Sequence, residues 1–206
     1  LGAWKVILFQ REILESQQAV FDFLKSIPVM ASPRFGVYLA HGSFDENLQQ
    51  SIVRYTNHFS RQGAPTPQDF VTHFEKAAER FPDKVQAKGS DNSMPRLFFA
   101  GHTHLKKLWQ WQGAASIWQE HTVEPGRRYS LEDAPLFVNP GSVGFPRDPS
   151  GCPSYVFVDW EQQNLVFQNV PYAADALKNA MAAEPYDTLI NDKLFFIEPC
   201  AQETKV

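Results

Sequence analysis

Apolar residues recur at helical spacing in the first part of the chain. Residues 4–14 carry a weak helical pattern. After it, apolar positions take the i, i+3, i+4, i+7 spacing of an amphipathic helix at Val20, Phe23, Leu24 and Ile27. Pro28 ends this pattern, because proline cannot continue the hydrogen-bonded backbone of a helix. The pattern predicts two helices in this part of the chain.

Three short apolar runs predict buried strands, and each run leads into a polar or glycine-containing turn. The runs are Phe35–Ala40, Leu97–Ala100 and Leu136–Val138. The first is followed by His41-Gly42-Ser43, the second by Gly101-His102-Thr103-His104, and the third by the turn Asn139–Gly144. We expect all three turns at strand ends.

The remaining segments alternate between helical and strand patterns. Helical faces are predicted within 48–59 and 66–81, an antiparallel ribbon within 108–131, a hairpin of 155–159 with 164–170, and a last helix over 173–184. The mixture predicts an α/β or α+β fold of layered sheets and helices. We expect residues 1–206 to form a single domain.

Composition narrows the class of protein. The chain has 206 residues, of which 43% are hydrophobic, enough for a packed core, and a formal net charge of −4. The acidic balance argues against a broad nucleic-acid surface. No apolar run is long enough to span a membrane, so we expect no membrane partner and a cytoplasmic location. Cys152 and Cys200 are too few for a disulfide scaffold, which favours free thiols.

The candidate chemistry lies in the histidines of the strand-end turns. Ligand sites of open α/β sheets lie outside the carboxyl ends of strands, so neighbouring strands would gather His41, His102 and His104 in one crevice. Neutral imidazole is a common ligand for Zn, Fe, Mn and Ni ions. Histidines at positions i and i+2 can present both rings on one side of an extended backbone.

Each of these features also has an ordinary structural interpretation. The Gly-His-Thr-His sequence can be a solvated surface turn, and a single histidine such as His41 is often no more than hydrogen-bonded packing. The Asn139–Gly144 turn can be a simple turn or can bring backbone N–H groups close to a phosphate.

Together and in this order, the three turns resemble the later motifs of the calcineurin-like metallophosphoesterases, most closely the small bacterial phosphodiesterase type. The resemblance runs from near Leu1 through the last predicted helix, and it implies a four-layer α/β/β/α sandwich and two divalent metal ions (Mn, Fe, Ni or Zn). It implies that His41 and His102 bind one metal and His104 the other. It also implies that the turn beginning at Asn139 buttresses the site, and that the substrate is a phosphate ester.

The earlier motifs of that family, Asp-x-His, Gly-Asp and Gly-Asn-His, have no counterpart in this chain. In the family they supply the bridging aspartate and the catalytic histidine, so no catalytic residue is assigned here. Because the chain opens on Leu1 rather than Met, we interpret it as the C-terminal portion of such a domain, lacking N-terminal strands. Missing strands would leave an unpaired sheet edge, and we therefore expect low stability or self-association.

Three functions follow as hypotheses. The first is metal-dependent hydrolysis of phosphodiesters or phosphomonoesters by the parent enzyme, with this chain carrying part of the dinuclear site. The second is a non-catalytic, degenerate module with a structural or protein-binding role. The third and weakest is nucleic-acid binding through Trp109, Trp111 and Trp118 with Lys106 and Lys107, although aromatic residues in ribbons are usually packing residues.

Overall fold

The structure is a computed structural model. It describes residues 2–28, 30–34, 36–41, 97–112, 117–132, 134–144, 146–182 and 200. The helices predicted within 48–59 and 66–81 lie outside the described residues. The chain divides into two compact units. The prediction of a single domain remains a prediction.

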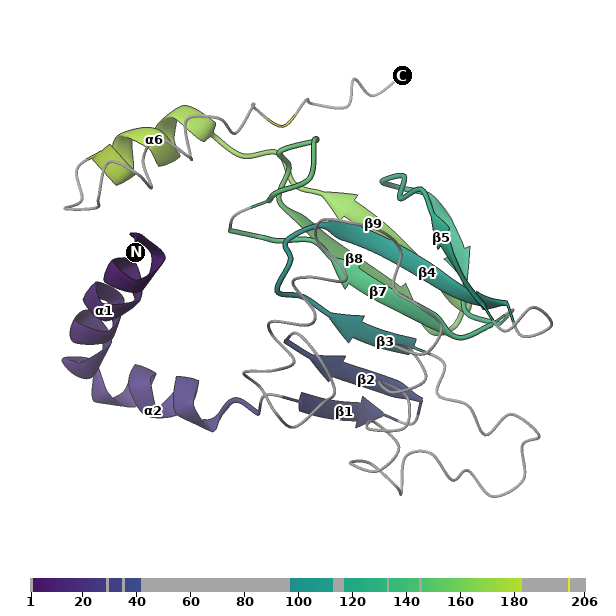
Figure 1. The fold of residues 1–206 in the computed structure, drawn as a ribbon, viewed down its shortest axis with the longest axis horizontal. Coiled ribbons are helices and arrows are strands. Elements are labelled where there is room, and N and C mark those ends of the chain that lie inside the picture. The colour runs from purple at the N-terminus through teal and green to yellow at the C-terminus, as the bar shows by residue number, and fades with distance from the viewer. Residues whose placement is uncertain are drawn as a thin grey trace. The chain divides into compact units, whose positions relative to one another are not determined.

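The first unit consists of residues 1–28, 150–152 and 171–206, and its described helices match the predicted ones. They are α1 (Gly2–Glu15), α2 (Gln18–Ser26) and α6 (Ala174–Ala182), shown in Figure 1. Side-chain pairs four residues apart support the first two helices. Arg11 pairs with Glu15 at 2.7 Å in α1, and Gln18 donates to Asp22 at 2.7 Å in α2. Of the helices that the structure describes, none is both long and apolar enough to cross a membrane.

The same unit holds a disulfide, which corrects the prediction of free thiols. Cys152 and Cys200 are joined, with their Cα atoms 4.7 Å apart and a separation of 48 positions in sequence. The sequence gives no sign of this pairing, because two isolated cysteines carry no spacing motif and only the folded chain brings them together.

The second unit, residues 29–149 and 153–170, contains a six-stranded sheet in the order β1-β2-β3-β7-β4-β5. Its strands are β1 (Met30–Arg34), β2 (Val37–Ala40), β3 (Leu97–Ala100), β4 (Lys106–Gln112), β5 (Ile117–His121) and β7 (Leu136–Pro140). The strands β2, β3 and β7 are parallel neighbours, whereas β1, β4 and β5 pair antiparallel (Figure 1). The three predicted apolar strands are confirmed as adjacent strands at the centre of this sheet.

A smaller sheet of three antiparallel strands has the order β6-β9-β8. Its strands are β6 (Arg128–Ser130), β8 (Ser154–Asp159) and β9 (Asn164–Asn169). The hairpin of β8 and β9 is confirmed, with Asp159 N-terminal to the turn accepting hydrogen bonds from the backbone N–H groups of Glu161 and Gln162. The predicted ribbon is confirmed for β4 and β5 only, because β6 pairs with β9 in the other sheet.

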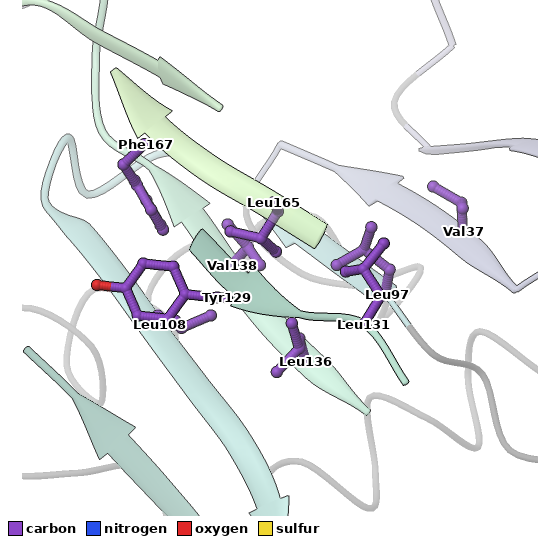
Figure 2. Packing of buried hydrophobic residues seen from close by; sticks show 9 residues of the cluster. All are labelled: Val37, Leu97, Leu108, Tyr129, Leu131, Leu136, Val138, Leu165 and Phe167. Carbon is purple, nitrogen blue, oxygen red and sulfur yellow. The ribbon is translucent and has the colours of Figure 1, made fainter. Parts of the chain in front are cut away.

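The two sheets of this unit pack face to face on an apolar core, seen in Figure 2. Both sheets contribute buried side chains to it: Val37, Leu97, Leu108, Leu136 and Val138 from the large sheet, and Tyr129, Leu165 and Phe167 from the small one. Fully burying one side chain of this size stabilises the fold by about 1.5–3 kcal/mol. The fold is therefore α+β, built on two stacked sheets with a mixed parallel and antiparallel larger sheet.

Candidate metal and phosphate site

The candidate site lies where the parallel strands of the large sheet end. Because β2, β3 and β7 run in the same direction side by side, the residues that follow them meet at one edge. The backbone N–H of Gly101 donates to the carbonyl oxygen of His41 at 2.8 Å, which joins the ends of β2 and β3 directly. A Cβ on Gly101 would contact that same oxygen at 3.5 Å, an ordinary van der Waals distance.

Two of the predicted histidines come together here. Nε2 of His41 lies 3.2 Å from Nδ1 of His102, and the two rings meet edge to face with centroids 5.1 Å apart. These residues are 61 positions apart in the sequence. A hydrogen bond at this distance requires one of the two nitrogens to carry a proton and the other to be unprotonated.

The loop that carries His102 and His104 is not extended, which corrects the backbone geometry expected from their i, i+2 spacing. Both residues have φ of 62°, in the left-handed region. The Thr103 side chain between them is buried, at 4% exposure. Left-handed backbone in residues with a Cβ costs on the order of 1–3 kcal/mol each and persists only where surrounding contacts enforce it.

Asn139 supplies those contacts from the end of β7. Its side-chain Nδ2 donates to the carbonyl oxygen of Gly101 at 2.9 Å and to Oγ1 of Thr103 at 2.8 Å, while its Oδ1 accepts from the backbone N–H of Gly141 at 3.0 Å. Asn139 is itself buried, at 1% exposure, so these hydrogen bonds form out of contact with water. The side-chain amide of Asn139 thus links the loop that carries the histidines to the turn at Gly141.

The turn after Asn139 is tightly packed. Gly141 has φ of +88°, and a Cβ placed on it would lie 2.2 Å from Oγ of Ser154 and 2.8 Å from Cγ of Lys106. Oγ of Ser154 donates to the carbonyl oxygen of Pro140 at 2.7 Å. Only glycine fits this position, because any side chain would collide with the residues that hold the turn.

Burial and three described basic residues act on the pKa of His102. Partial burial lowers the pKa of His102 below its ordinary value of 6.5, and the positive charges that His41, His104 and Arg147 can carry lower this pKa further. His102 is therefore neutral near pH 7. A neutral imidazole has a nitrogen lone pair for a metal ion.

The two close histidines fit a divalent metal ion as a pair of donors. Two nitrogen ligands at about 2.1 Å from one tetrahedral ion lie about 3.4 Å apart, close to the separation of the His41 and His102 nitrogens. His104 belongs to the same loop, but within the described part of the chain no three His, Cys, Asp or Glu side chains are grouped closely enough to hold an ion. The ligand roles of His41, His102 and His104 stay predictions.

Sequence reasoning overlooked Arg147 and Lys106 as parts of this site. The backbone N–H of Arg147 donates to the carbonyl oxygen of His104 at 3.1 Å. Lys106 directly follows the histidine loop, and its side chain is buried beside Asp148. The only signal in the sequence was their position. Lys106 lies two residues after His104, and Arg147 lies a few residues after the Asn139–Gly144 turn.

Trp109, one of the three tryptophans considered for contact with bases, lies inside the large sheet's packing. Trp109 is buried, at 2% exposure, and its ring packs edge to face against Phe137 with centroids 5.8 Å apart. A ring in that position cannot stack on a nucleic-acid base. Trp109 is thus a packing residue of the large sheet.

Comparisons with known proteins agree with the fold. No protein-family model matches the chain, and the search of curated proteins finds no match. The structure is similar to the crystal structure of a metallophosphoesterase from Sphaerobacter thermophilus, with a TM-score of 0.60 and 20% sequence identity. The match covers 86% of this chain and 62% of that chain, so this chain spans less than two thirds of its length. The chain therefore has a metallophosphoesterase-like fold.

Proposed function

We propose that the protein takes part in metal-dependent hydrolysis of phosphodiesters or phosphomonoesters, with His41, His102 and His104 as ligands of divalent ions. The single observation that carries this proposal is the pair of imidazole nitrogens 3.2 Å apart, held at the carboxyl ends of parallel strands. The metallophosphoesterase-like fold supports it. By resemblance to that family, His41 and His102 serve one ion and His104 the other.

The residues of the site would favour the binding of such ions. When bound, divalent ions stabilise charge on phosphoryl oxygens and lower the pKa of a coordinated water molecule. Neutral His102 offers a lone pair, and the proton shared between His41 and His102 has to leave for both nitrogens to serve as ligands. Asn139 keeps the strained loop in place, so the ligand positions are fixed before an ion arrives.

The proposal is tested on the complete gene product, loaded with Mn²⁺ or Zn²⁺. Bis(p-nitrophenyl) phosphate and p-nitrophenyl phosphate serve as the two substrates. We expect hydrolysis of at least one ester that EDTA abolishes and that falls by at least about a hundredfold in His102→Ala, since a lost ligand typically removes the metal. Metal-loaded protein that cleaves neither ester would refute the proposal.

A second candidate function is that of a non-catalytic module. The hydrogen bond between His41 and His102 favours it, because the two imidazoles satisfy each other without an ion. Elemental analysis separates the two functions. A gene product purified without chelator and lacking stoichiometric metal would support the module.

A further inference from the structure

Two turns follow each other in the loop that carries the histidines, and each turn has one histidine at its centre. In the first, the backbone N–H of Thr103 donates to the carbonyl oxygen of Gly101 at 2.7 Å and closes a three-residue turn around His102. In the second, the backbone N–H of Leu105 donates to Oγ1 of Thr103 at 3.4 Å, and this turn encloses His104. The two histidines have the same φ of 62°. A backbone hydrogen bond closes the first turn, and a side-chain hydroxyl closes the second.

The Thr103 hydroxyl is also fixed from the neighbouring strand. Nδ2 of Asn139 donates to its Oγ1 at 2.8 Å, and the Thr103 side chain is buried. A hydroxyl oxygen can accept two hydrogen bonds, and this one accepts from Asn139 and from Leu105. Because Asn139 belongs to β7, the hydroxyl anchors the turn around His104 to the large sheet.

The pair of His41 and His102 is held without this hydroxyl. The carbonyl oxygen of His41 accepts from the backbone N–H of Gly101 at 2.8 Å. Nδ2 of Asn139 also donates to the carbonyl oxygen of Gly101 at 2.9 Å. These hydrogen bonds, like the one that closes the first turn, use no atom of the Thr103 side chain. Removal of the hydroxyl should therefore change the second turn and spare the histidine pair.

Resting on the proposed function, we propose that Thr103 is a positioning residue whose hydroxyl orients His104 and thereby sets the affinity for the second divalent ion. Left-handed backbone is unfavourable for a residue with a Cβ, so the turn around His104 needs contacts that enforce it. Without the hydroxyl, this turn loses its link to Asn139, and right-handed and extended conformations become accessible to it. The imidazole of His104 then leaves the position in which it would serve an ion.

The variant Thr103→Val tests the proposal, because valine has the shape of threonine without the hydroxyl. Thr103→Ser keeps the hydroxyl, and Thr122→Val is the control at an exposed threonine directly after β5. The first readout is amide hydrogen exchange of the complete gene product without metal. We expect the Leu105 amide to exchange about fivefold faster in Thr103→Val, since one hydrogen bond is lost. The amide at position 103 should keep its protection, and Thr103→Ser and Thr122→Val should match the wild type.

Calorimetric titration of the same variants with Mn²⁺ gives the second readout. We expect the wild type to bind two ions. In Thr103→Val we expect the second ion to bind about ten- to a hundredfold more weakly, with the Kd of the first ion unchanged, since groups that orient a ligand typically contribute this much to metal affinity. Thr103→Ser should restore the wild-type affinity. A purely structural role of Thr103 would instead weaken both ions alike.

The proposal is overturned if Thr103→Val binds both ions as the wild type does, if it weakens both equally, if the wild type binds a single ion, or if Leu105 keeps its protection. Thr103→Ala takes the place of Thr103→Val should the latter not fold. If the wild type binds no Mn²⁺ while the Leu105 exchange depends on the hydroxyl, the proposed function fails and the hold of Thr103 on the turn around His104 stands.

Discussion

At the scale of single residues, the site depends on backbone conformations that few residue types adopt. His102 and His104 both have left-handed φ, and the amide of Asn139 holds the loop between them. The same amide accepts a hydrogen bond from Gly141, whose own φ is positive. Strain that is enforced by a buried hydrogen-bonding side chain is typical of functional loops.

Gly141 offers a test of this packing, with Gly126 as its control. Both glycines have positive φ, but a Cβ on Gly126 would meet nothing within 4 Å, whereas one on Gly141 would collide with Ser154 and Lys106. We expect Gly126→Ala to cost about 1–2 kcal/mol from backbone strain. We expect Gly141→Ala to cost roughly 1–3 kcal/mol more from overpacking. Urea denaturation measures both, and equal losses would contradict the described turn.

The pKa of His102 predicts a pH dependence of stability. Since burial and nearby positive charges lower this pKa in the folded chain, the unfolded chain takes up a proton at His102 more readily below about pH 6.5. Stability from this group is therefore present above that pH and is lost as the pH falls. We expect the thermal midpoint of metal-free wild type to fall between pH 7.5 and 5, and to fall less in His102→Gln.

The control for this experiment is His121→Gln, which removes a histidine of β5 whose Nε2 lies 3.1 Å from Oε1 of Gln110. This variant keeps the part of the pH dependence that belongs to His102. If His102→Gln and wild type show the same slope, the lowered pKa is refuted.

At the scale of elements, sequence patterns located the strands better than their partners. The runs that became β2, β3 and β7 are short and apolar, as central parallel strands usually are, so their turns could be placed at one edge. Strand β1 was not predicted, because it includes Ser32 and Pro33 and a proline within a run argues against a central strand. The structure places β1 at the edge of the sheet, where proline is tolerated.

The sequence could not show partners that depend on long-range contacts. Strand β6 pairs with β9 instead of continuing the ribbon of β4 and β5, and local alternation does not encode that choice. The same limit applies to the residues of the candidate site. His41 and His102 were predictable from strand ends, but Arg147 reaches the site through a backbone hydrogen bond, which carries no side-chain signal.

The stacked sheets predict a large effect at Leu165. This residue of β9 is fully buried at 0% exposure in the core between the sheets, whereas Phe157 of the edge strand β8 is 57% exposed. We expect Leu165→Ala to lower the free energy of unfolding by about 2–5 kcal/mol. The control Phe157→Ala should cost less than about 1 kcal/mol in the monomer. Comparable losses in urea denaturation would argue against the packed interface of Figure 2.

At the scale of the whole molecule, the chain comprises two compact units, and the disulfide belongs to the smaller one. Cys152 lies between β7 and β8, two residues before Ser154, whose hydroxyl supports the glycine turn. The disulfide therefore links two segments of this unit that are distant in sequence. Self-association through unpaired sheet edges stays a prediction for sedimentation measurements.

The disulfide predicts a redox dependence of stability. Closing a loop of this length restricts the unfolded chain and typically contributes about 2–4 kcal/mol. We expect dithiothreitol to lower the thermal midpoint of wild type and to leave the Cys152→Ser/Cys200→Ser double variant unchanged. Alkylation of both cysteines in native, unreduced protein at full stoichiometry would show that the bond is absent.

The central claim is that His41 and His102 hold a divalent ion at the ends of β2 and β3. Inductively coupled plasma mass spectrometry of the complete gene product, after dialysis against Mn²⁺ and removal of free ions, measures this directly. We predict at least one bound ion per chain in wild type and in His121→Gln, and its loss in His41→Ala/His102→Ala. A wild type without bound metal, or a double variant that retains the same amount, would contradict the account.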